Sequence, residues 1–364
     1  MKSDFTCGFI GLGLIGGSIA RAIRQFYPSS RLLAYDLNQE TLETAVSDGV
    51  IDLALPSIDE AFAQCRYIFL CAPVSENDKN LLTLKSHLSP NCLLTDVGSV
   101  KTDIHKHIEE AGLSGQFIGG HPMAGSERTG YINSKALLLQ NAYYILTPCA
   151  EISSTVTEKF RDFIASLGAI PLVLTCAQHD YVTAAISHLP HVIAASLVNL
   201  IKAADSEEGI MKLIAAGGFK DITRIASSSP VMWQQICLTN KDNISRLLAI
   251  YIKSLEQIKS QIDTSCSAQL FDFFDDARRY RDSFIEASSG PIKKTFSIRI
   301  EIADEPGALA SIATILALNQ ISIKNIGIVH NREQEDGVLR VEFYQEESIK
   351  KASEILASKG YTVY

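Results

Sequence analysis

The residues that most clearly indicate chemistry lie near the N-terminus, where glycines alternate with apolar side chains. Residues 11–16 read GLGLIG after an apolar run and before a helical pattern, and Asp36 follows Gly16 by twenty residues. This arrangement is the fingerprint of a loop that binds a dinucleotide at the N-terminus of a helix. The Asp36 carboxylate would accept hydrogen bonds from the adenosine ribose and repel a 2′-phosphate. The sequence therefore predicts NAD as the cofactor and hydride transfer as the chemistry.

Each glycine of this loop has a physical role. Gly11 allows a tight turn, Gly13 lets the backbone approach the diphosphate, and Gly16 lets the helix pack closely on the strand. Two interpretations stay open for the Ala-Pro pair that follows the later apolar run at 67–71, namely contact with the cofactor or a structural role. The predicted cofactor contacts are Gly11, Leu12, Gly13, Leu14, Ile15, Gly16, Asp36, Ala72 and Pro73.

Two further strings follow apolar runs and carry polar side chains. Ser99 and Lys101 lie in TDVGSVK, residues 95–101, and His121 lies in GGHPMAGSE, residues 119–127. The carboxyl ends of parallel strands meet at one edge of a sheet, so we expect Ser99 and His121 near the nicotinamide. A single histidine is more often structural, but one placed between a Gly-Gly pair and a proline at a strand end favours a functional role.

The C-terminal half contributes two more strings, ISHLPH at 186–191 and GGFKDITR at 217–224. An arginine such as Arg224 can bind a carboxylate through two parallel hydrogen bonds, which a lysine cannot do as well. The alternative for Asp221 and Arg224 is a surface ion pair at i,i+3 spacing.

Short apolar runs alternate with helical patterns between residues 5 and 174, which predicts a parallel sheet with crossover helices. The expected strands are 5–10, 31–35, 67–71, 92–95, 117–119, 143–146 and 170–174, and the expected helices are 15–24, 39–48, 76–87, 101–111 and 156–166. Such a sheet would carry the first three strings at its carboxyl edge.

The rest of the chain predicts two other folds. Residues 176–288 show apolar side chains at three and four spacing and are expected to be helical. After SSGP at 288–291, which is typical of a linker, the pattern predicts a ferredoxin-like βαββαβ unit. The predicted fold class is α/β, with a Rossmann domain at 1–175, an all-α substrate and dimerisation domain at 176–290, and a ferredoxin-like module at 295–364. We expect a homodimer.

Composition restricts the function classes. The chain has 364 residues, 46% of them hydrophobic, and a formal net charge of −8. This charge is unfavourable for coating nucleic acid or an anionic membrane. The eight cysteines are dispersed without zinc-ligand spacing, which predicts a cytoplasmic protein and no metal site. The glycine-rich N-terminus superficially resembles a secretory signal, and the stretch 185–201 is apolar, but neither is expected to be a membrane segment.

Five strings, taken in chain order, resemble the prephenate/arogenate dehydrogenase family of tyrosine biosynthesis over about residues 5–290. They are GLGLIGGS, TDVGSVK, GGHPMAGSE, ISHLPHVIA and GGFKDITRIA. The resemblance implies NAD-dependent oxidative decarboxylation of prephenate to 4-hydroxyphenylpyruvate. Hydride leaves the ring carbon that bears the hydroxyl group while the ring carboxylate leaves as carbon dioxide, and the product ring is aromatic.

The same resemblance implies roles for individual residues. His121 would draw off the hydroxyl proton as the hydride departs, and Ser99 would hold the hydroxyl group and the imidazole in register. Arg224 would bind a substrate carboxylate. The residues expected to orient the site or face the substrate side chain are Lys101, Ser126, Glu127, His188 and Asp221.

The turn at 304–309, DEPGAL, resembles the start of an ACT domain, a module that commonly senses amino acids. By this resemblance the expected effector is L-tyrosine, acting as a feedback inhibitor. The residues expected to line its site are Asp304, Gly307, Ala308, Leu309, Asn325 and Ile326. The alternative is a dimerisation module without a ligand.

Other functions stay open at this stage. An arogenate or dual-specificity cyclohexadienyl dehydrogenase would take a substrate whose side chain bears an ammonium group, which Glu127 could favour. A different β-hydroxyacid dehydrogenase would leave the strings GGFKDITR and HPMAGSE without a purpose. A non-catalytic amino-acid-binding protein would not need His121, Ser99 and Arg224 together.

Overall fold

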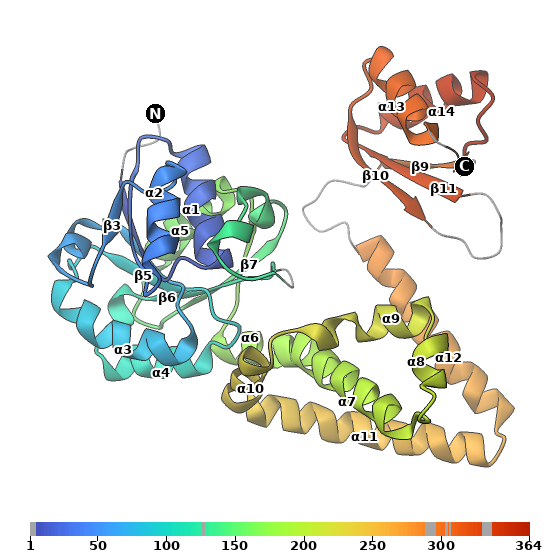
Figure 1. The fold of residues 1–364 in the computed structure, drawn as a ribbon, viewed down its shortest axis with the longest axis horizontal. Coiled ribbons are helices and arrows are strands. Elements are labelled where there is room, and N and C mark those ends of the chain that lie inside the picture. The colour runs from blue at the N-terminus through green and yellow to red at the C-terminus, as the bar shows by residue number, and fades with distance from the viewer. Residues whose placement is uncertain (1–4, 126–127, 288–295, 303–304, 306, 330–336) are drawn as a thin grey trace. The chain divides into compact units, whose positions relative to one another are not determined.

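The computed structural model describes residues 5–125, 128–287, 296–302, 305, 307–329 and 337–364 (Figure 1). Contacts within the chain divide it into two compact units, Met1–Gln257 and Ile258–Tyr364. The first unit contains a parallel sheet followed by helices, and the second ends in a small antiparallel sheet. The predicted boundaries of three domains stay predictions.

A five-stranded parallel sheet forms the centre of the first unit, in the order β3-β2-β1-β4-β5. Its strands are β1 (Thr6–Ile10), β2 (Arg31–Tyr35), β3 (Leu53–Leu55), β4 (Tyr67–Leu70) and β5 (Leu93–Asp96). Four of these strands agree with the predicted ranges, whereas β3 was not predicted because a run of three apolar residues is too short to show a period. The strand order reverses between β1 and β4, and ligands of such sheets bind at the carboxyl edge near this point.

Helices cover both faces of this sheet, as the predicted alternation requires. The helices α1 (Leu14–Phe26), α2 (Gln39–Ser47) and α5 (Ser154–Ser166) share one apolar core with it. The helices α3 (Val74–Leu84) and α4 (Thr102–Glu110) share the other (Figure 1). The arrangement is a doubly wound Rossmann fold.

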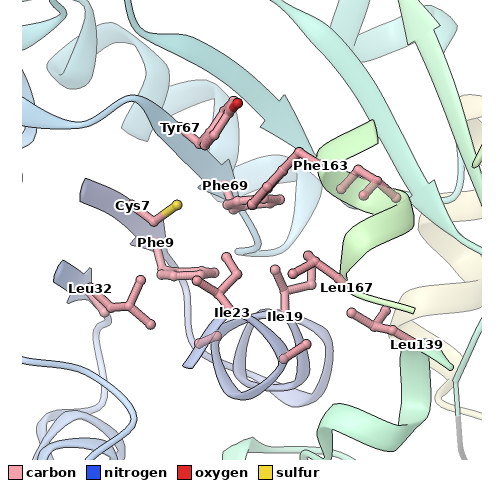
Figure 2. Packing of buried hydrophobic residues seen from close by; sticks show 14 of the residues in the cluster. Cys7, Phe9, Ile19, Ile23, Leu32, Tyr67, Phe69, Leu139, Phe163 and Leu167 are labelled. Carbon is pink, nitrogen blue, oxygen red and sulfur yellow. The ribbon is translucent and has the colours of Figure 1, made fainter. Parts of the chain in front are cut away.

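The core on the first face holds α1 in place. Phe9 and Phe69 stack on neighbouring strands with ring centroids 5.3 Å apart, and Tyr67 stacks on Phe163 of α5 at 4.5 Å. Figure 2 shows Ile19 of α1 packed among these side chains. Because α1 is anchored along its buried face, its N-terminus is held at the carboxyl edge of the sheet.

Three more strands extend the sheet beyond β5. The strands β6 (Ile118–Pro122), β7 (Tyr143–Pro148) and β8 (Ile170–Val173) pair in the order β6-β7-β8, and a parallel bridge joins Leu94 to Phe117. The expectation of parallel pairing is wrong for β7, which runs antiparallel to β6. In its described residues, the connection from β6 to β7 contains short 3₁₀ turns that pack on α1 and no crossover helix.

The helical part of the first unit begins with one continuous stretch, in which α6 (Cys176–Thr183) and α7 (Leu189–Ala204) are joined by a π-helical turn, Ala184–His188. Pro190 has no backbone N–H and cannot donate a hydrogen bond within the helix. π-Helical turns of this kind are frequent at functional sites. The elements that follow are α8 (Ile210–Ile214), α9 (Gly217–Thr223), the 3₁₀ turn η7 (Arg224–Ser227), α10 (Pro230–Thr239) and α11 (Lys241–Asp263).

The stretch Cys176–Ala204 is long and apolar enough to cross a membrane by composition, with a mean hydropathy of 1.5. Within the part of the chain that the structure describes, no second helix meets this criterion. In the single chain only 17% of its most apolar window is buried. The prediction that it is not a membrane segment stays a prediction.

The second unit begins at Ile258, within α11, continues through α12 (Ser267–Ala287) and then forms the small sheet. Its other elements are β9 (Phe296–Ile302), α13 (Ala308–Leu318), β10 (Ile323–Val329), β11 (Gly337–Phe343) and α14 (Glu347–Ser358). The antiparallel sheet has the order β10-β11-β9, and the C-terminal residues bridge to β9 through Val363 and Ile300. The predicted ferredoxin-like order is confirmed, and the predicted linker at 288–291 lies outside the described residues.

A matched pair of leucines tests how much the core under α1 contributes to stability. Leu139 is 0% exposed in this core, whereas Leu137 of the same 3₁₀ turn is 69% exposed. We expect Leu139→Ala to destabilise the protein by about 2–5 kcal/mol, because it leaves a cavity, and Leu137→Ala by less than about 0.5 kcal/mol. Calorimetric unfolding of the two variants measures the difference, and similar losses in both would contradict the packing described.

Candidate active site

The glycine loop joins β1 to α1 where the strand order reverses. Gly11 has a φ of +88°, and a Cβ there would lie 2.5 Å from the backbone nitrogen of Ala72, so only glycine fits. A Cβ on Gly16 would lie 2.7 Å from the carbonyl oxygen of Gly11. Around Gly13, by contrast, no described atom lies within 4 Å of the Cβ position, and no side chain caps α1 there. The amide groups of the first helical turn therefore face open space that an anion can occupy.

Asp36 stands beside this loop, just beyond the end of β2. Its carboxylate accepts hydrogen bonds from the backbone N–H groups of Leu12, at 2.6 Å, and of Asn38, at 2.8 Å. A carboxylate has about four acceptor positions, so two remain for the hydroxyl groups of a ligand. Leu12 itself is buried in the core, and Ile15 packs against the same core.

Ala72 and Pro73 follow β4, and the backbone of Ala72 lies beside Gly11 of the glycine loop. The side chain of the buried Asn77 donates a hydrogen bond of 2.9 Å to the carbonyl oxygen of Ala72. This contact fixes the backbone after β4. Leu14, the first residue of α1, is half-buried beside the loop.

A cavity of about 370 Å³ lies between the carboxyl edge of the sheet and the helices that follow it. Ser99 and His121 line it from the sheet, and His188 and His191 line it from the π-helical turn and α7. The structure thus brings together residues of three strings, at 95–101, 119–127 and 186–191. The other lining residues are Pro122, Met123, Ala124, Gly125, Ser187, Ile225, Ser228, Met232, Trp233 and Ile236.

His121 is the second-last residue of β6 and contacts a second histidine. Its Nδ1 lies 2.8 Å from Nε2 of His179. Burial lowers the pKa of His121 well below its usual range, and the nearby His179, Lys101 and His188 lower it further. The His121 imidazole is therefore neutral at pH 7 and can accept a proton.

The Gly-Gly pair before His121 has a structural cause. A Cβ on Gly119 would lie 2.3 Å from the hydroxyl oxygen of Thr147, and one on Gly120 would lie 2.5 Å from the backbone oxygen of Asp96. Only glycines let β6 approach its neighbours this closely. The pair therefore determines where His121 emerges from the sheet.

Lys101, which was predicted to orient the site, does not line the cavity. Its side chain is 0% exposed, and its ammonium group donates hydrogen bonds to the carboxylate of Asp96 and to the carbonyl oxygen of Gly120, at 2.7 Å. The Asp96 carboxylate also accepts from the N–H groups of Gly98, at 2.9 Å, and Gly120, at 3.0 Å. Lys101 therefore joins the ends of β5 and β6 behind His121.

The two histidines of the helical side are held by hydrogen bonds on one ring nitrogen each. Nδ1 of the buried His188 lies 3.2 Å from the side-chain nitrogen of Asn240, and burial is the main cause that lowers the pKa of His188 to about 4. Nδ1 of His191 donates to the carbonyl oxygen of Ser187 at 2.9 Å. The His191 ring stacks on Trp233 with centroids 3.7 Å apart.

Neither Arg224, the predicted carboxylate-binding residue, nor Asp221, predicted to orient the site, lines the cavity. Arg224 is exposed at the start of η7, and its neighbour Ile225 lines the cavity. Burial is the main cause that lowers the pKa of His191, and the positive charge of Arg224 lowers it further. Asp221 is exposed on α9 and is not among the lining residues. The predicted residues Ser126 and Glu127 lie outside the described residues.

Sequence reasoning missed four residues of this site. His179, Asp180 and Asn240 form a buried polar network behind the cavity, and Trp233 forms part of its wall. The adjacent His-Asp pair in the first turns of the helical stretch was an available signal. Asn240 carries no comparable signal, because its contacts with α6 and the π-helical turn depend on the tertiary fold.

A second cavity, of about 300 Å³, lies in the C-terminal fold. Gly307 and Ala308, at the start of α13, line it together with Glu301, Glu305 and residues near the C-terminus. Of the other predicted effector contacts, Leu309, Asn325 and Ile326 are exposed and do not line it, and Asp304 lies outside the described residues.

Within the described part of the chain, no group of three or more His, Cys, Asp or Glu side chains could hold a metal ion. The eight cysteines are free.

A dinucleotide loop and a cavity lined by histidines, both at one edge of a doubly wound sheet, are the arrangement of the Rossmann dehydrogenases. Two family models match the chain: "Prephenate dehydrogenase, nucleotide-binding domain" over residues 19–172 and "Prephenate dehydrogenase, dimerization domain" over residues 175–276. A prephenate dehydrogenase of Bacillus subtilis is 36% identical over 352 residues, which cover 96% of this chain and 95% of that protein. The chain belongs to the prephenate dehydrogenase family.

Solved structures agree with this assignment. A prephenate dehydrogenase of A. aeolicus in complex with hydroxyphenyl propionate and NAD⁺ has a TM-score of 0.73 and 31% identity, covering 78% of this chain and 99% of that one. An arogenate dehydrogenase of Synechocystis has a TM-score of 0.69 and 31% identity, covering 77% of this chain and all of that one.

The buried lysine provides a test of the site's framework. We expect Lys101→Met to destabilise the protein by about 3–5 kcal/mol, because it leaves the Asp96 carboxylate buried without its partner. Lys106→Met is the matched control, since Lys106 is exposed on α4 and its contact with Glu110 is 3.9 Å long. Thermal unfolding of both variants checks this, and a Lys101 variant as stable as the control would show that the pair does not hold the strands.

Proposed function

We propose that the protein catalyses the NAD-dependent oxidative decarboxylation of prephenate to 4-hydroxyphenylpyruvate. The observation that carries this proposal is the neutral His121, which lines a cavity beside Ser99 at the same sheet edge as the glycine loop. The curated relative from Bacillus subtilis and the A. aeolicus structure support it, since both are described as prephenate dehydrogenases.

The residues of the glycine loop fit NAD. The open space at Gly13 and the uncapped N-terminus of α1 would hold the diphosphate, and Asp36 would bind the ribose of the adenosine half. The A. aeolicus relative is described with NAD⁺ bound. The bound nicotinamide supplies the acceptor for the hydride.

The chain's own groups manage the proton. His121 accepts the proton of the ring hydroxyl group as the carbon–hydrogen bond breaks, so that a carbonyl can form at that carbon. Ser99 positions the hydroxyl group against the imidazole. The ring carboxylate then leaves as carbon dioxide, its bonding electrons complete the aromatic ring, and the carbonyl oxygen takes a proton back to become the phenol hydroxyl group. Aromatisation makes the reaction strongly favourable and leaves mainly orientation to the protein.

The substrate is a dianion, so the cavity must supply hydrogen-bond donors. We assign Arg224, at the rim, to a substrate carboxylate, and His188 to an orienting contact inside the cavity. Ser126 and Glu127, which follow the lining residues 122–125, remain the residues proposed to face the substrate side chain. Lys101 and Asp221 have no proposed contact with substrate.

Arogenate dehydrogenase is the second candidate, because the Synechocystis relative is described by that name at 31% identity. The two substrates share the ring and differ in whether the side chain carries a keto or an ammonium group. The reaction at the ring would be the same with either substrate.

A direct assay separates these candidates. We expect absorbance at 340 nm to rise when the protein and NAD are mixed with prephenate, and kcat/KM with prephenate to exceed that with arogenate. A higher kcat/KM with arogenate would reverse the assignment of substrate. No reduction of NAD with either compound would contradict the proposed function as a whole.

The role of His121 predicts a specific kinetic change. His121→Asn should lower kcat by about 10²-fold or more with little change in KM, since general-base catalysis contributes factors of this size. Because the pKa of His121 is lowered, its imidazole should remain neutral and act as a base at pH values below 6.5. The kcat/KM of the wild-type protein should therefore be retained below pH 6.5. A variant that kept most of its kcat would show that another group takes the proton.

We further propose that the protein is a homodimer, that its location is cytoplasmic, and that its C-terminal fold is an ACT domain that binds L-tyrosine. The matched dimerization model and the poorly buried apolar stretch 176–204 support the dimer, and the eight free cysteines agree with a reducing compartment. The ferredoxin-like order and the cavity at Gly307 support the ACT assignment.

Tyrosine regulation is tested with the full-length protein. Millimolar L-tyrosine should lower the rate of NAD reduction, with L-phenylalanine as the matched control ligand. Gly307→Val should abolish this inhibition and leave the rate without tyrosine unchanged, because Gly307 has a φ of +95° and lines the C-terminal cavity. Equal rates with and without tyrosine, together with no heat of binding in calorimetry, would leave a dimerisation module as the better explanation.

A further inference from the structure

We infer that a buried hydrogen-bond network centred on Asp180 holds His121 and His188 in opposite tautomers. A ring nitrogen of His121 then faces the cavity as a proton acceptor, and an N–H group of His188 faces it as a hydrogen-bond donor. The tautomers follow from the network with a neutral His179. Their consequence for rate rests on the proposed function.

The network begins at the carboxylate of Asp180 on α6, which is 1% exposed. One oxygen accepts from the backbone N–H of Lys101 at 2.8 Å and lies 2.7 Å from Nδ1 of His179. The other accepts from the backbone N–H of Thr102, at 2.8 Å, and from its hydroxyl group. Burial raises the pKa of Asp180, but the hydrogen bonds from His179, Thr102 and the backbone outweigh it and lower the pKa to about 2. The group is ionised at neutral pH and can only accept hydrogen bonds.

The ionised carboxylate determines the tautomer of His179. Nδ1 of His179 must carry the proton, because it faces an oxygen of Asp180 that cannot donate. In a neutral imidazole the second nitrogen is then an acceptor. Nε2 of His179, which is fully buried, therefore presents a lone pair toward His121.

This lone pair determines the tautomer of His121. Nδ1 of His121 lies 2.8 Å from Nε2 of His179 and must donate, so Nε2 of His121 carries no proton. Nε2 is then the nitrogen that accepts the substrate's proton. When it does so, the positive charge formed on His121 is linked through His179 to the negative charge of Asp180. A carboxylate that orients and stabilises a catalytic imidazole in this way acts by the same principle in serine hydrolases.

A second branch of the network reaches His188. The side-chain nitrogen of Asn240 donates to the backbone carbonyl of Asp180 at 2.8 Å, and its oxygen accepts from Asn243 at 2.8 Å. Because a carbonyl cannot donate, these contacts fix which end of the Asn240 amide is the nitrogen. The same nitrogen lies 3.2 Å from Nδ1 of His188, which must accept. A neutral His188 therefore carries its proton on Nε2 and is a hydrogen-bond donor, which suits an anionic substrate.

A competing arrangement gives the opposite result for His121. If His179 were protonated and formed an ion pair with Asp180, its Nε2–H would donate to Nδ1 of His121. The proton of a neutral His121 would then lie on Nε2, and the nitrogen assigned to the substrate could not act as a base. The two arrangements are distinguishable by experiment.

The tautomers can be measured without any turnover. Full-length protein labelled with ¹⁵N in its histidine rings is examined by solid-state NMR at pH 7.5 without ligands, and His121→Asn and His188→Asn assign the signals. We expect His121 to show a protonated Nδ1 and a bare Nε2, and His188 to show the reverse. A protonated Nε2 on neutral His121, or the same tautomer on both residues, would overturn the inference, whatever substrate the enzyme uses.

Two substitutions at His179 test the effect on rate. Glutamine can place an acceptor oxygen near the position of Nε2, whereas phenylalanine fills the space without an acceptor. With whichever substrate is active, we expect His179→Phe to lower kcat by about 10²- to 10³-fold with KM nearly unchanged, and His179→Gln to stay within about tenfold of the wild type. Equal losses in both variants would show that His179 has only a structural role.

His105→Phe is the matched control. His105 is a half-buried histidine of α4 whose ring contacts Thr147 and Cys149 rather than the network of Asp180, His179 and His121. We expect it to lower the unfolding temperature about as much as His179→Phe while kcat falls far less. If kcat fell equally in both, loss of structure would explain the effect. Should His179→Phe fail to fold, the NMR spectrum of the wild type and of His179→Gln decides the question.

Discussion

The site depends on one buried ion pair, between the ammonium group of Lys101 and the carboxylate of Asp96. The carboxylate accepts hydrogen bonds from the backbone N–H groups of Gly98 and Gly120, and the ammonium group donates one to the carbonyl oxygen of Gly120. The end of β5, the start of α4 and the end of β6 are therefore held at one point. A buried charge is costly without its partner, so this pair defines the geometry more than it adds stability. Ser99 and His121 lie on the two segments that the pair joins.

A second carboxylate, that of Asp180, attaches the helical stretch to the same point. It binds the first N–H groups of α4 and also the imidazole of His179, so the strand edge and α6 share one acceptor. The polar side of the cavity is thereby assembled before any ligand arrives. Preorganised groups of this kind need little rearrangement as charge develops during a reaction. The opposite side is built differently, from Met232, Trp233 and Ile236 of α10.

Local sequence patterns predicted the parts of the fold that depend on local geometry. The spacing of Gly11, Gly13 and Gly16 required a strand, a tight turn and a helix, and the structure has all three. The antiparallel direction of β7 could not be predicted in the same way, because it depends on how the preceding connection packs on α1. The ferredoxin-like order was predictable because each of its elements is long enough to show its own period.

The candidate site was predictable only in part, for a related reason. His121 stood out because of its glycines, and the structure explains these glycines by the close approach of neighbouring strands. Lys101 was predicted to orient the site, but its string could not indicate the partners that bury it, Asp96 and Gly120. The contact of His179 with His121 spans 58 positions in the sequence, so no local pattern could indicate it.

The two sides of the cavity come from different elements, and this division bears on how such an enzyme could diversify. The groups that handle the proton belong to β6, α6 and the π-helical turn, where Asp180 also caps α4, so an exchange there disturbs several contacts at once. The cavity-lining residues of α10 meet a ligand through shape alone, apart from the indole N–H of Trp233, the residue on which His191 of α7 stacks. Substitutions on that helix can reshape the space around a side chain while the acid–base groups keep their positions. A change of substrate within one reaction type is thus structurally simpler here than a change of reaction.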